Sequence, residues 1–499
     1  PAHPAIALGK VRCVGDAVAF VVAETLEEAR AAAEAIEVDY ELLPAVGSML
    51  DAIRPGAPAI FEEIPDNTCF DWECGDAKST EEAFKQAAHI ARISLVNNRL
   101  VGNPMEPRAA VADYDTGRDH YTLWTTSQFP HIVKLLMGNF VLHIPQHKLR
   151  VVAPDVGGGF GVKQFLYAEE AVLTWAAGKL GRPVKWVNER SEGFISDAHG
   201  RDHISDAELA LDAEGKFLGL KVRTIANMGG YLSSFGPNIP TNLYGLLLAG
   251  VYTTPAIHCE VKGVFTNTIP VDAYRGAGRP EATFLLERLV DVAAAEMRID
   301  RAEIRRKNMI DASQYPYQTP VIVKYDSGDP KACLAKALEV GKWDAFAERK
   351  AESAKKGKLR GIGLCTYVEA CGLAPSRIVQ SLGARAGIFE SATVRVHATG
   401  DITVLIGTHN HGQGHETTFA QIVSEKLDIP VDKIEIVFGD TDKVQFGLGT
   451  YGSRSLAVGG TALVKATDKV IDKGRKIAAH MLEASVGDIV FEKGSFTVA

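Results

Sequence analysis

The chain has 499 residues, of which 46% are hydrophobic and 23% charged, and its formal net charge is -8 with a pI near 6.0. This length and composition predict a globular protein of about two to four domains. The acidic balance argues against nucleic acid as the main partner, because phosphate binding requires a basic face. The sequence holds no run of about 18 apolar residues, so no membrane span is expected.

The seven cysteines are scattered, and none forms a C-x-x-C pair. This pattern predicts neither a disulfide framework nor an iron–sulfur or zinc site. Unpaired thiols are typical of a reducing compartment, so we expect a cytoplasmic protein. The chain begins at Pro1, and its first residues look like the end of a domain. We therefore expect the true N-terminus to be missing, and the lack of a signal peptide carries no information.

The predicted elements alternate between strands and helices along the chain. Residues 15–41 predict strand, helix and strand, and residues 50–76 predict a linker, because they combine three prolines with little periodicity. Further strands are predicted at 89–100, 109–115, 120–128, 149–156, 203–229 (with a turn at 212–215), 361–369, 391–398 and 401–407. Helices are predicted at 131–141, 167–180, 281–298, 330–340 and 416–427. Mixed sheets with helices on their faces, an α+β class, follow from this order.

A first glycine cluster, VVAPDVGGGFGVKQ, spans residues 151–164 between a predicted strand and a predicted helix. Its spacing fits neither G-x-G-x-x-G nor G-x-x-x-x-G-K-[ST]. Three consecutive glycines before Phe160 nevertheless leave backbone amides open to a ligand oxygen. A tight turn without a ligand is the alternative.

A second cluster, GTHNHGQGHETTFAQI, starts at Gly407 and also joins a strand to a helix. Its three histidines lack the H-E-x-x-H geometry of a helical metal site. An anion held by residues 412–414 and the N-terminus of the following helix is the stronger interpretation. Downstream, GDTD (439–442) and GTYGSRS (449–455) add polar turns, with Arg454 as a possible phosphate or partner contact.

A third cluster, VDAYRGAGRPEA, spans residues 271–282. Gly276 and Gly278 allow the backbone to approach a ligand, and Arg275 and Arg279 can carry charge. A structural turn is again the alternative. One further polar residue, Gln128 in WTTSQFPH, ends a predicted strand and precedes a helix, so its amide could point into a shared crevice.

Together and in this order, WTTSQ, GGGFGVK, DAYRGAGRPEA and HGQGHETT with GTYGSRS resemble the molybdenum-binding large subunit of the xanthine oxidase family. Among its branches, the chain most resembles the aerobic carbon monoxide dehydrogenase type, in a variant with AYRGAGR. The resemblance implies the end of an α/β hammerhead domain at 1–50. It further implies two mixed α+β molybdenum-cofactor-binding domains, at 75–312 and at 330–499, the second of them truncated.

The resemblance implies molybdenum with molybdopterin cytosine dinucleotide, lying between the two large domains. Gln128 would hydrogen-bond an oxo ligand, and no protein side chain would ligate the metal, since the pterin does. The implied catalytic residues are Gln128, Phe160, Arg275 and Gly276. The implied cofactor-binding residues are Gln128, Gly158, Gly159, Phe160, Gly161, Tyr274, Arg275, Gly276, Gln413, Gly414, His415, Glu416, Thr417, Gly452 and Ser453.

The implied reaction is hydroxylation of a small molecule with water as the oxygen source. A glutamate general base in a G-x-G-E turn is typical of the family, and we expect it beyond Ala499 because no such turn occurs here. A small iron–sulfur subunit with [2Fe–2S] clusters and a medium FAD subunit are the implied partners. A dimer of heterotrimers is the expected assembly.

Departures from the family's patterns bear on the substrate. The copper-binding cysteine of carbon monoxide dehydrogenase would stand at Gly276, whereas purine hydroxylases would have glutamate at Gln164 and phenylalanine at Ala277. An aldehyde or an N-heterocycle is therefore the expected substrate. Oxidation of CO without the cysteine is one alternative, and a non-catalytic assembly or binding module is another.

Overall fold

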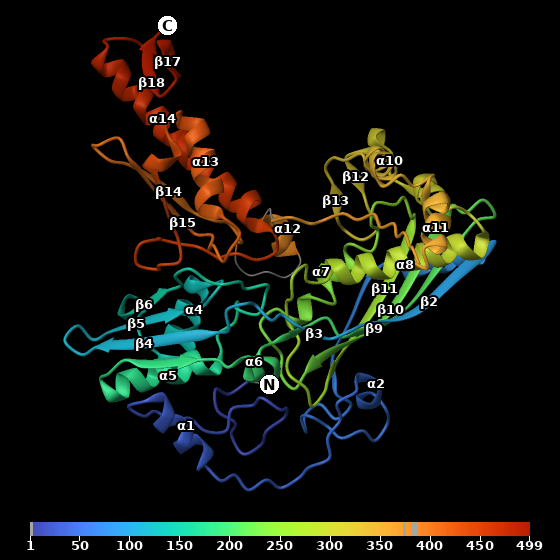
Figure 1. The fold of residues 1–499 in the computed structure, drawn as a ribbon, viewed down its shortest axis with the longest axis horizontal. Coiled ribbons are helices and arrows are strands. Elements are labelled where there is room, and N and C mark those ends of the chain that lie inside the picture. The colour runs from blue at the N-terminus through green and yellow to red at the C-terminus, as the bar shows by residue number, and fades with distance from the viewer. Residues whose placement is uncertain (1–2, 373–375, 382–386) are drawn as a thin grey trace. The chain divides into compact units, whose positions relative to one another are not determined.

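The computed structural model describes residues 3–372, 376–381 and 387–499. The chain divides into two compact units. Unit 1 comprises Leu43–Leu100 and His199–Glu369, and unit 2 comprises Ala2–Leu42, Val101–Ala198 and Ala370–Ala499. Each unit combines mixed sheets with helices (Figure 1), which confirms the predicted α+β class.

Unit 1 is built around one large sheet. Its elements are α2 (Met49–Ala52), β1 (Thr68–Gly75), α3 (Ala77–Lys85), β2 (His89–Asn97), β8 (His199–Gly200), β9 (His203–Leu211), β10 (Phe217–Gly229), α7 (Asn242–Gly245), β11 (Ala256–Phe265), α8 (Arg279–Met297), α9 (Arg301–Asn308), β12 (Tyr317–Gln318), β13 (Lys324–Tyr325), α10 (Pro330–Gly341) and α11 (Phe346–Lys355).

The sheet of unit 1 has the order β1-β11-β10-β9-β2, with β10 and β11 parallel and the other neighbours antiparallel. The long helix α8 packs against β2 and β9, while α3 packs against β10 and β11. The predicted turn at 212–215 joins β9 to β10, where the Asp212 side chain accepts the backbone N–H of Lys216 at 2.7 Å. Gly215 there has φ +82°, a conformation that glycine adopts without strain.

Unit 2 contains a four-stranded sheet, a three-stranded sheet and the two-stranded hairpin β17–β18. Its elements are α1 (Leu26–Glu34), β4 (Ala109–Asp115), β5 (His120–Thr125), α4 (Pro130–Leu136), β6 (Leu149–Val152), α5 (Ala168–Leu180), β7 (Val184–Val187), α6 (Arg190–Ser196), α12 (Ser376–Ser381), β14 (Ala392–Val396), β15 (Ile402–Ile406), α13 (His415–Leu427), β16 (Ile434–Val437), α14 (Thr461–Met481), β17 (Ile489–Glu492) and β18 (Ser495–Val498), and the short β3 (Leu100–Val101) crosses from unit 1 into unit 2.

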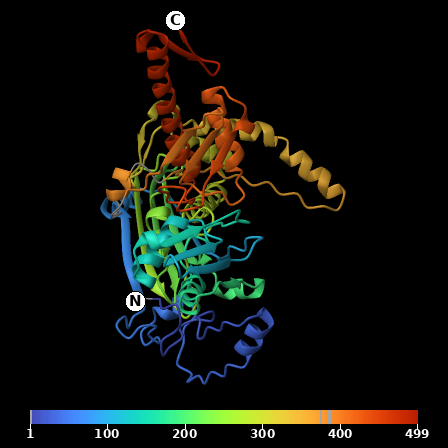
Figure 2. The same ribbon diagram turned by 90° about the vertical axis from the view of Figure 1, so that its left-hand side faces the viewer.

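The first sheet of unit 2 has the order β6-β5-β4-β7 and is covered by α4 and α5. The second sheet, β14-β15-β16, packs against α13 and α14. The red helix α14 lies beside the orange strands in both ribbon views (Figures 1 and 2). Because each sheet buries its own apolar cluster, around Leu123 and around Val404, the loops at the strand ends project from two rigid supports.

Three sequence predictions of secondary structure are wrong. Residues 68–75 of the expected linker form β1, which pairs with β11. No strand forms on either side of α1, or over 361–369, in the described part of the chain. Over 361–369 the backbone bonds to side chains instead: Glu287 accepts the N–H of Thr366 at 2.8 Å. An alternating pattern of apolar and polar residues is compatible with a strand, but it does not show whether a second strand is available to pair with it.

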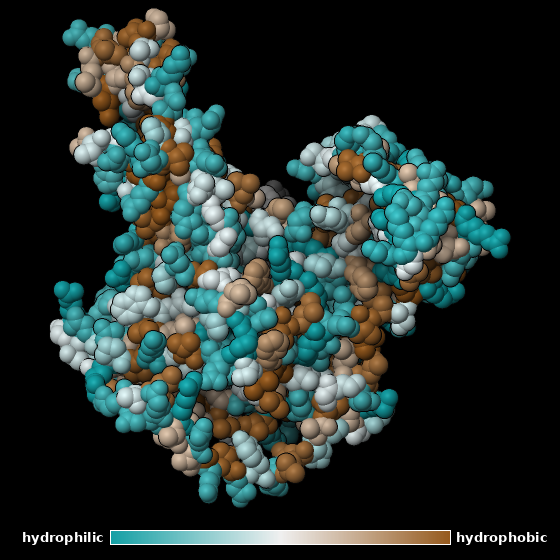
Figure 3. Space-filling model, viewed as in Figure 1, coloured by the Kyte–Doolittle hydropathy of each residue, from teal (hydrophilic) through white to brown (hydrophobic). Residues whose placement is uncertain are grey.

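Some apolar side chains remain on the surface of unit 2. They gather near the end of α14 and the β17–β18 hairpin (Figure 3), where Met481 is 74% exposed and Ile477 is 51% exposed. Single exposed apolar residues are common on protein surfaces. Among the described residues, no helix combines the length and apolar character needed to cross a bilayer.

Candidate cofactor site

Gln128 follows β5 in unit 2 and is only 3% exposed. Its Nε2 donates to the Thr450 carbonyl at 3.0 Å, and its Oε1 accepts the backbone N–H of Gly161 at 3.0 Å. Its own N–H donates to the Lys163 carbonyl at 2.7 Å. The side chain therefore joins two of the predicted loops, the glycine cluster at 157–163 and the turn at 449–455.

The glycine cluster is shaped to this amide. An added Cβ at Gly159 would lie 2.4 Å from the Gln128 Oε1, so only glycine fits there. Gly158 and Gly161 have φ of +95° and +106°, and Phe160 has φ 55°, a conformation that is unusual for a bulky residue. The Phe160 ring is 40% exposed. Gly158, Gly159, Phe160 and Gly161 thus form one loop around a buried polar anchor, with the Phe160 ring over Gly158.

The other end of this loop is held by Glu106, which sequence reasoning missed. Its carboxylate accepts the N–H of Gly157 at 2.8 Å and the Nζ of Lys163 at 2.7 Å. The Lys163 side chain is fully buried, and burial lowers its pKa while the bond to Glu106 opposes that shift. No motif marks Glu106, because its partners lie more than 50 residues away in sequence.

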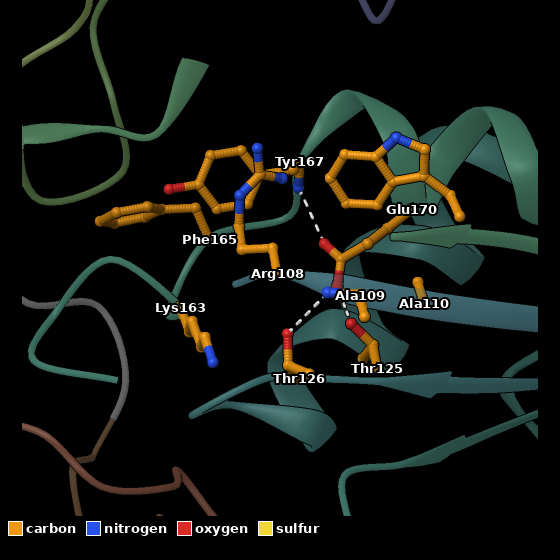
Figure 4. Close-up of a pocket in the computed structure, with 10 residues that line it drawn as sticks. Arg108, Ala109, Ala110, Thr125, Thr126, Lys163, Phe165, Tyr167 and Glu170 are labelled. Atoms are coloured by element: carbon orange, nitrogen blue, oxygen red, sulfur yellow. Dashed lines mark hydrogen bonds between the residues drawn. The ribbon is translucent and has the colours of Figure 1, made fainter. Parts of the chain in front are cut away.

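A small pocket lies beside the same loop (Figure 4), lined by Arg108, Ala109, Ala110, Thr125, Thr126, Lys163, Phe165, Tyr167, Glu170 and Trp186. The Arg108 guanidinium lies 3.6 Å from the centre of the Tyr167 ring and pairs with Asp197 at 2.6 Å. Glu170 accepts the N–H of Tyr167 at 2.9 Å and bonds to Thr125. Burial raises the pKa of Glu170. These contacts fasten α5 to β4 and β5 under the glycine cluster.

The second predicted loop ends at α13. Asn410 organises it, since its Oδ1 accepts the N–H of Gln413 at 3.0 Å and its Nδ2 donates to Glu416. Gly412 and Gly414 have φ of +110° and +79°, and an added Cβ at either would meet no atom within 4 Å. Gly414 caps α13 without a side-chain hydrogen bond. The loop thus presents open glycines at the N-terminus of a helix of 13 residues.

His409 and His415 of this loop contact other residues of the chain. His409 is fully buried and bonds through Nε2 to the Ala153 carbonyl at 2.9 Å. Burial lowers the pKa of His409 to about 4, although the bond to Ala153 opposes this. The His415 ring stacks on Phe419, with ring centres 4.9 Å apart. No group of three or more His, Cys, Asp or Glu side chains suited to a metal ion occurs within 3–372, 376–381 and 387–499.

In the turn at 449–455, Gly452 accepts the N–H of Gly372 at 3.1 Å, and Ser453 has φ 55°. The prediction that Arg454 contacts a phosphate or a partner is wrong. The Arg454 side chain is 0% exposed and pairs with the equally buried Glu390. It also donates to the Gly449 carbonyl at 3.0 Å. Arg454 therefore supports the turn from within the unit, and the charge that looked available in sequence is already neutralised.

The third predicted loop, at Tyr274–Gly276, lies in unit 1 just before α8. Arg275 is exposed, and Tyr274 and Gly276 are half-buried. The Ala277 N–H donates to the Tyr274 carbonyl at 2.7 Å, which closes a turn. Gly276 has φ +95°, and an added Cβ would lie 2.3 Å from the Pro280 Cγ. The ring of Pro280 thus fills the place of any side chain at position 276.

In unit 2 the structure brings together Gln128, the glycine cluster with Gly161 and the turn with Thr450. The Gln413–Thr417 loop forms in unit 2 and the Tyr274–Gly276 loop in unit 1. A phosphate-bearing cofactor fits the unit 2 loops, because the N-terminus of α13 has no side-chain cap and a helix N-terminus attracts oxyanions. The Gln128 amide is a buried polar group, which packing alone would not require, and its presence is compatible with a role in binding a ligand. The residues present are therefore compatible with the implied molybdopterin cofactor.

Comparison with known protein families supports this interpretation. Two family models, each described as a molybdopterin cofactor-binding domain, match residues 60–309 and 336–499. The model of the aldehyde oxidase and xanthine dehydrogenase a/b hammerhead domain matches residues 2–44. The fold predicted from the four loops, a hammerhead segment followed by two cofactor-binding domains, is thereby confirmed.

Individual relatives agree. The carbon monoxide dehydrogenase large chain of Hydrogenophaga pseudoflava is 40% identical over 96% of this chain and 62% of its own length. The 6-hydroxypseudooxynicotine dehydrogenase complex subunit gamma of Paenarthrobacter nicotinovorans is 35% identical over 99% of this chain and 61% of its own length. The chain thus spans about three fifths of the length of these relatives.

Solved structures show the same fold. The crystal structure of the Cu,Mo-CO dehydrogenase superimposes with a TM-score of 0.92 at 35% identity, covering 99% of this chain and 64% of that one. Quinoline 2-oxidoreductase from Pseudomonas putida 86 superimposes with a TM-score of 0.93 at 33% identity, covering 99% and 62%. The chain therefore belongs to the xanthine oxidase family, within its molybdopterin-binding large subunits.

Proposed function

We propose that this chain is the molybdenum-cofactor subunit of a multi-subunit hydroxylase that oxidises an aldehyde or an N-heterocycle with water as the oxygen source. The observation that carries the proposal is the glycine loop 158–161, which is held on the buried side chain of Gln128 in a chain built of molybdopterin cofactor-binding domains. When bound, molybdopterin cytosine dinucleotide would supply the redox metal and the site of oxygen transfer.

The chain's own residues would hold and orient this cofactor. Gln128 keeps one N–H of its amide for a ligand, since its other donor contact is the Thr450 carbonyl. Phe160 would pack against the site with its exposed ring. The residues from Gln413 to Thr417 would bind the pterin and pyrophosphate at the start of α13, where no side chain caps the helix. Gly452 and Ser453 would complete the lining within unit 2, and we propose Tyr274–Gly276 of unit 1 as further cofactor-binding residues.

The backbone at Gly276 argues against CO as the substrate. A copper-bridged site needs a thiol, and position 276 has none. It also has no room for one, because a Cβ would overlap Pro280 at 2.3 Å and φ is +95°. The 40% identity to a carbon monoxide dehydrogenase large chain keeps CO oxidation as the second candidate. Relatives named for nicotine and quinoline oxidation favour an N-heterocycle.

Partners follow from the electrons that such a reaction releases. A small iron–sulfur subunit and a medium FAD subunit would carry them away from this chain, and a dimer of heterotrimers is the assembly we propose. A cytoplasmic location agrees with the finding that all seven cysteines are free thiols.

The first test is the metal and nucleotide content of the protein. Purified from a molybdenum-replete host with its complex, the chain should contain about one molybdenum and release one cytidine monophosphate on acid hydrolysis, as one cofactor site requires. A protein free of both would refute the proposal and favour a non-catalytic assembly or binding module.

The second test identifies the substrate. The holoenzyme is offered an aromatic aldehyde, quinoline, nicotine and CO in water labelled with oxygen-18, and product mass and copper content are measured. We expect a labelled acid or hydroxylated heterocycle and no stoichiometric copper. Oxidation of CO alone, with about one copper per molybdenum, would establish the second candidate instead.

A further inference from the structure

Residues 200–202 of unit 1 pack directly against the Tyr274–Gly276 loop. An added Cβ at Gly200 would lie 2.2 Å from the Tyr274 Cβ, so the two backbones approach as closely as glycine allows. Arg201 and Asp202 then have φ of 66° and 71°, both left-handed and neither a glycine. Two consecutive residues in this conformation persist only where the surrounding structure over-determines them.

Asp202 fixes this backbone on one side. Its carboxylate accepts the Nε of Arg99 at 2.8 Å and the Nδ2 of Asn227 at 3.0 Å. Its N–H donates to the Asn97 carbonyl at 3.1 Å. The segment is therefore anchored to the central sheet, and the neighbouring Arg201 extends from a fixed point.

Arg201 directs its side chain at the loop. Its Nη2 donates to the Arg275 carbonyl at 2.8 Å, and its Nη1 lies 3.4 Å from the Tyr274 carbonyl and 3.0 Å from the Glu281 carboxylate. Arg201 is 8% exposed, and the Glu281 side chain is 0% exposed. Arg279 donates to the next carbonyl, that of Gly276, at 3.0 Å. Guanidinium groups thus bind three successive carbonyls.

This arrangement sets the direction of a peptide group. A trans peptide is planar, and its C=O and N–H point in opposite directions. Because the Arg275 carbonyl points at Arg201, the Gly276 N–H points away from it. Arg201 therefore fixes the face of the loop that offers the Gly276 amide, which is the kind of donor that suits a ligand oxygen.

We propose that Arg201 is a positioning residue, which holds the peptide planes of Tyr274–Gly276 so that the Gly276 amide is kept available to a ligand oxygen. The inference rests on the proposed function for the identity of the ligand. A lysine at position 201 cannot replace the arginine, since a single ammonium lacks the planar fork that reaches two carbonyls and a carboxylate together.

The test compares Arg201→Lys with a matched control, Arg305→Lys, in the full chain purified from a molybdenum-replete host. Arg305 is as buried, pairs with Glu287 at 2.9 Å in the same unit, and does not bond to the loop. Amide hydrogen exchange is measured in peptides covering 273–279, and the Mo(V) electron paramagnetic resonance spectrum is recorded. We expect exchange about tenfold faster and an altered Mo(V) spectrum in Arg201→Lys only.

Exchange within twofold of wild type in Arg201→Lys, or equal changes in both variants, would overturn the proposal. If Arg201→Lys does not fold, Glu281→Gln takes its place, because it weakens the partner that orients the guanidinium; unchanged exchange there overturns the proposal as well. Exchange needs no cofactor, so a wild-type protein without molybdenum would refute the proposed function while still testing Arg201.

Discussion

Replacing Gly159 with alanine tests whether the glycine cluster is built around Gln128. The new Cβ would lie 2.4 Å from the Gln128 Oε1 and 2.6 Å from its Cδ. The φ of Gly159 is not left-handed, so alanine adds steric overlap without backbone strain. Gln128 cannot move aside cheaply, since its amide bonds to Thr450 and Gly161.

The loss in the free energy of unfolding can be estimated for two responses of the structure. Moving the Gln128 side chain breaks two hydrogen bonds of 3.0 Å, each worth about 0.5–1.5 kcal/mol, or about 1–3 kcal/mol together. Keeping them and distorting the loop is an overpacking change, which costs about 1–3 kcal/mol. Both routes predict a loss of about 2 kcal/mol in the free energy of unfolding of the protein.

Urea unfolding followed by tryptophan fluorescence measures this loss, and molybdenum content reports the cofactor. The control is Gly363→Ala, where an added Cβ meets nothing within 4 Å; it should change the free energy by no more than about 0.5 kcal/mol. If Gly159→Ala matches this control and keeps its molybdenum, the amide is not the support of the loop and the reasoning fails.

Three further outcomes are expected. Burial holds the pKa of His409 at about 4, below the unfolded value of about 6.5. The unfolded state therefore binds the proton first, and the free energy of unfolding should fall by about 2–3 kcal/mol as the pH drops from 6.5 to 4. In His409→Gln, a plot of the free energy of unfolding against pH should be flatter over this range. Arg454→Met should destabilise by about 3–5 kcal/mol by leaving Glu390 unpaired, and the double variant with Glu390→Gln should recover part of that loss in a double-mutant cycle. In Gly412→Ala the added Cβ would contact no atom of the chain, but the backbone there has φ +110°. The substitution should therefore lower the free energy of unfolding by only about 1–2 kcal/mol. A fall in bound cytidine nucleotide in this variant would indicate that the cofactor contacts this loop.

Periodicity predicted most of the elements that support the site. The helices at 167–180 and 281–298 form as α5 and α8 within two residues of the expected bounds, because they bury one apolar side against a sheet. The failures share a cause. Residues 68–75 fall in a predicted linker and residues 361–369 in a predicted strand, yet only residues 68–75 pair with another strand. Pairing over nearly 200 residues leaves no local signal in the sequence.

Sequence marks the residues of the candidate site that lie on glycine-rich loops, and it does not mark the side chains that support these loops from a distance. Gln128, Phe160 and Gly276 belong to motifs with unusual composition. Glu106 and Arg201 hold those motifs from 51 and 74 residues away and stand in ordinary sequence. A supporting side chain needs only the right charge and reach, so its identity becomes visible when the fold brings its partners together.

Backbone strain helps to decide between a cofactor loop and a plain turn. Phe160, Ala277 and Ser453 have φ of 55°, 42° and 55°, one in each of three predicted loops. Among the other left-handed residues, Arg298 and Asp428 end helices, where that conformation is ordinary, and Arg201 and Asp202 are held by their own side-chain contacts. A plain turn would accept glycine at all three positions without the cost of about 1 kcal/mol or more that a side chain adds. A side chain kept there despite the cost is typical of a residue that contacts a ligand, which favours the cofactor interpretation of all three loops.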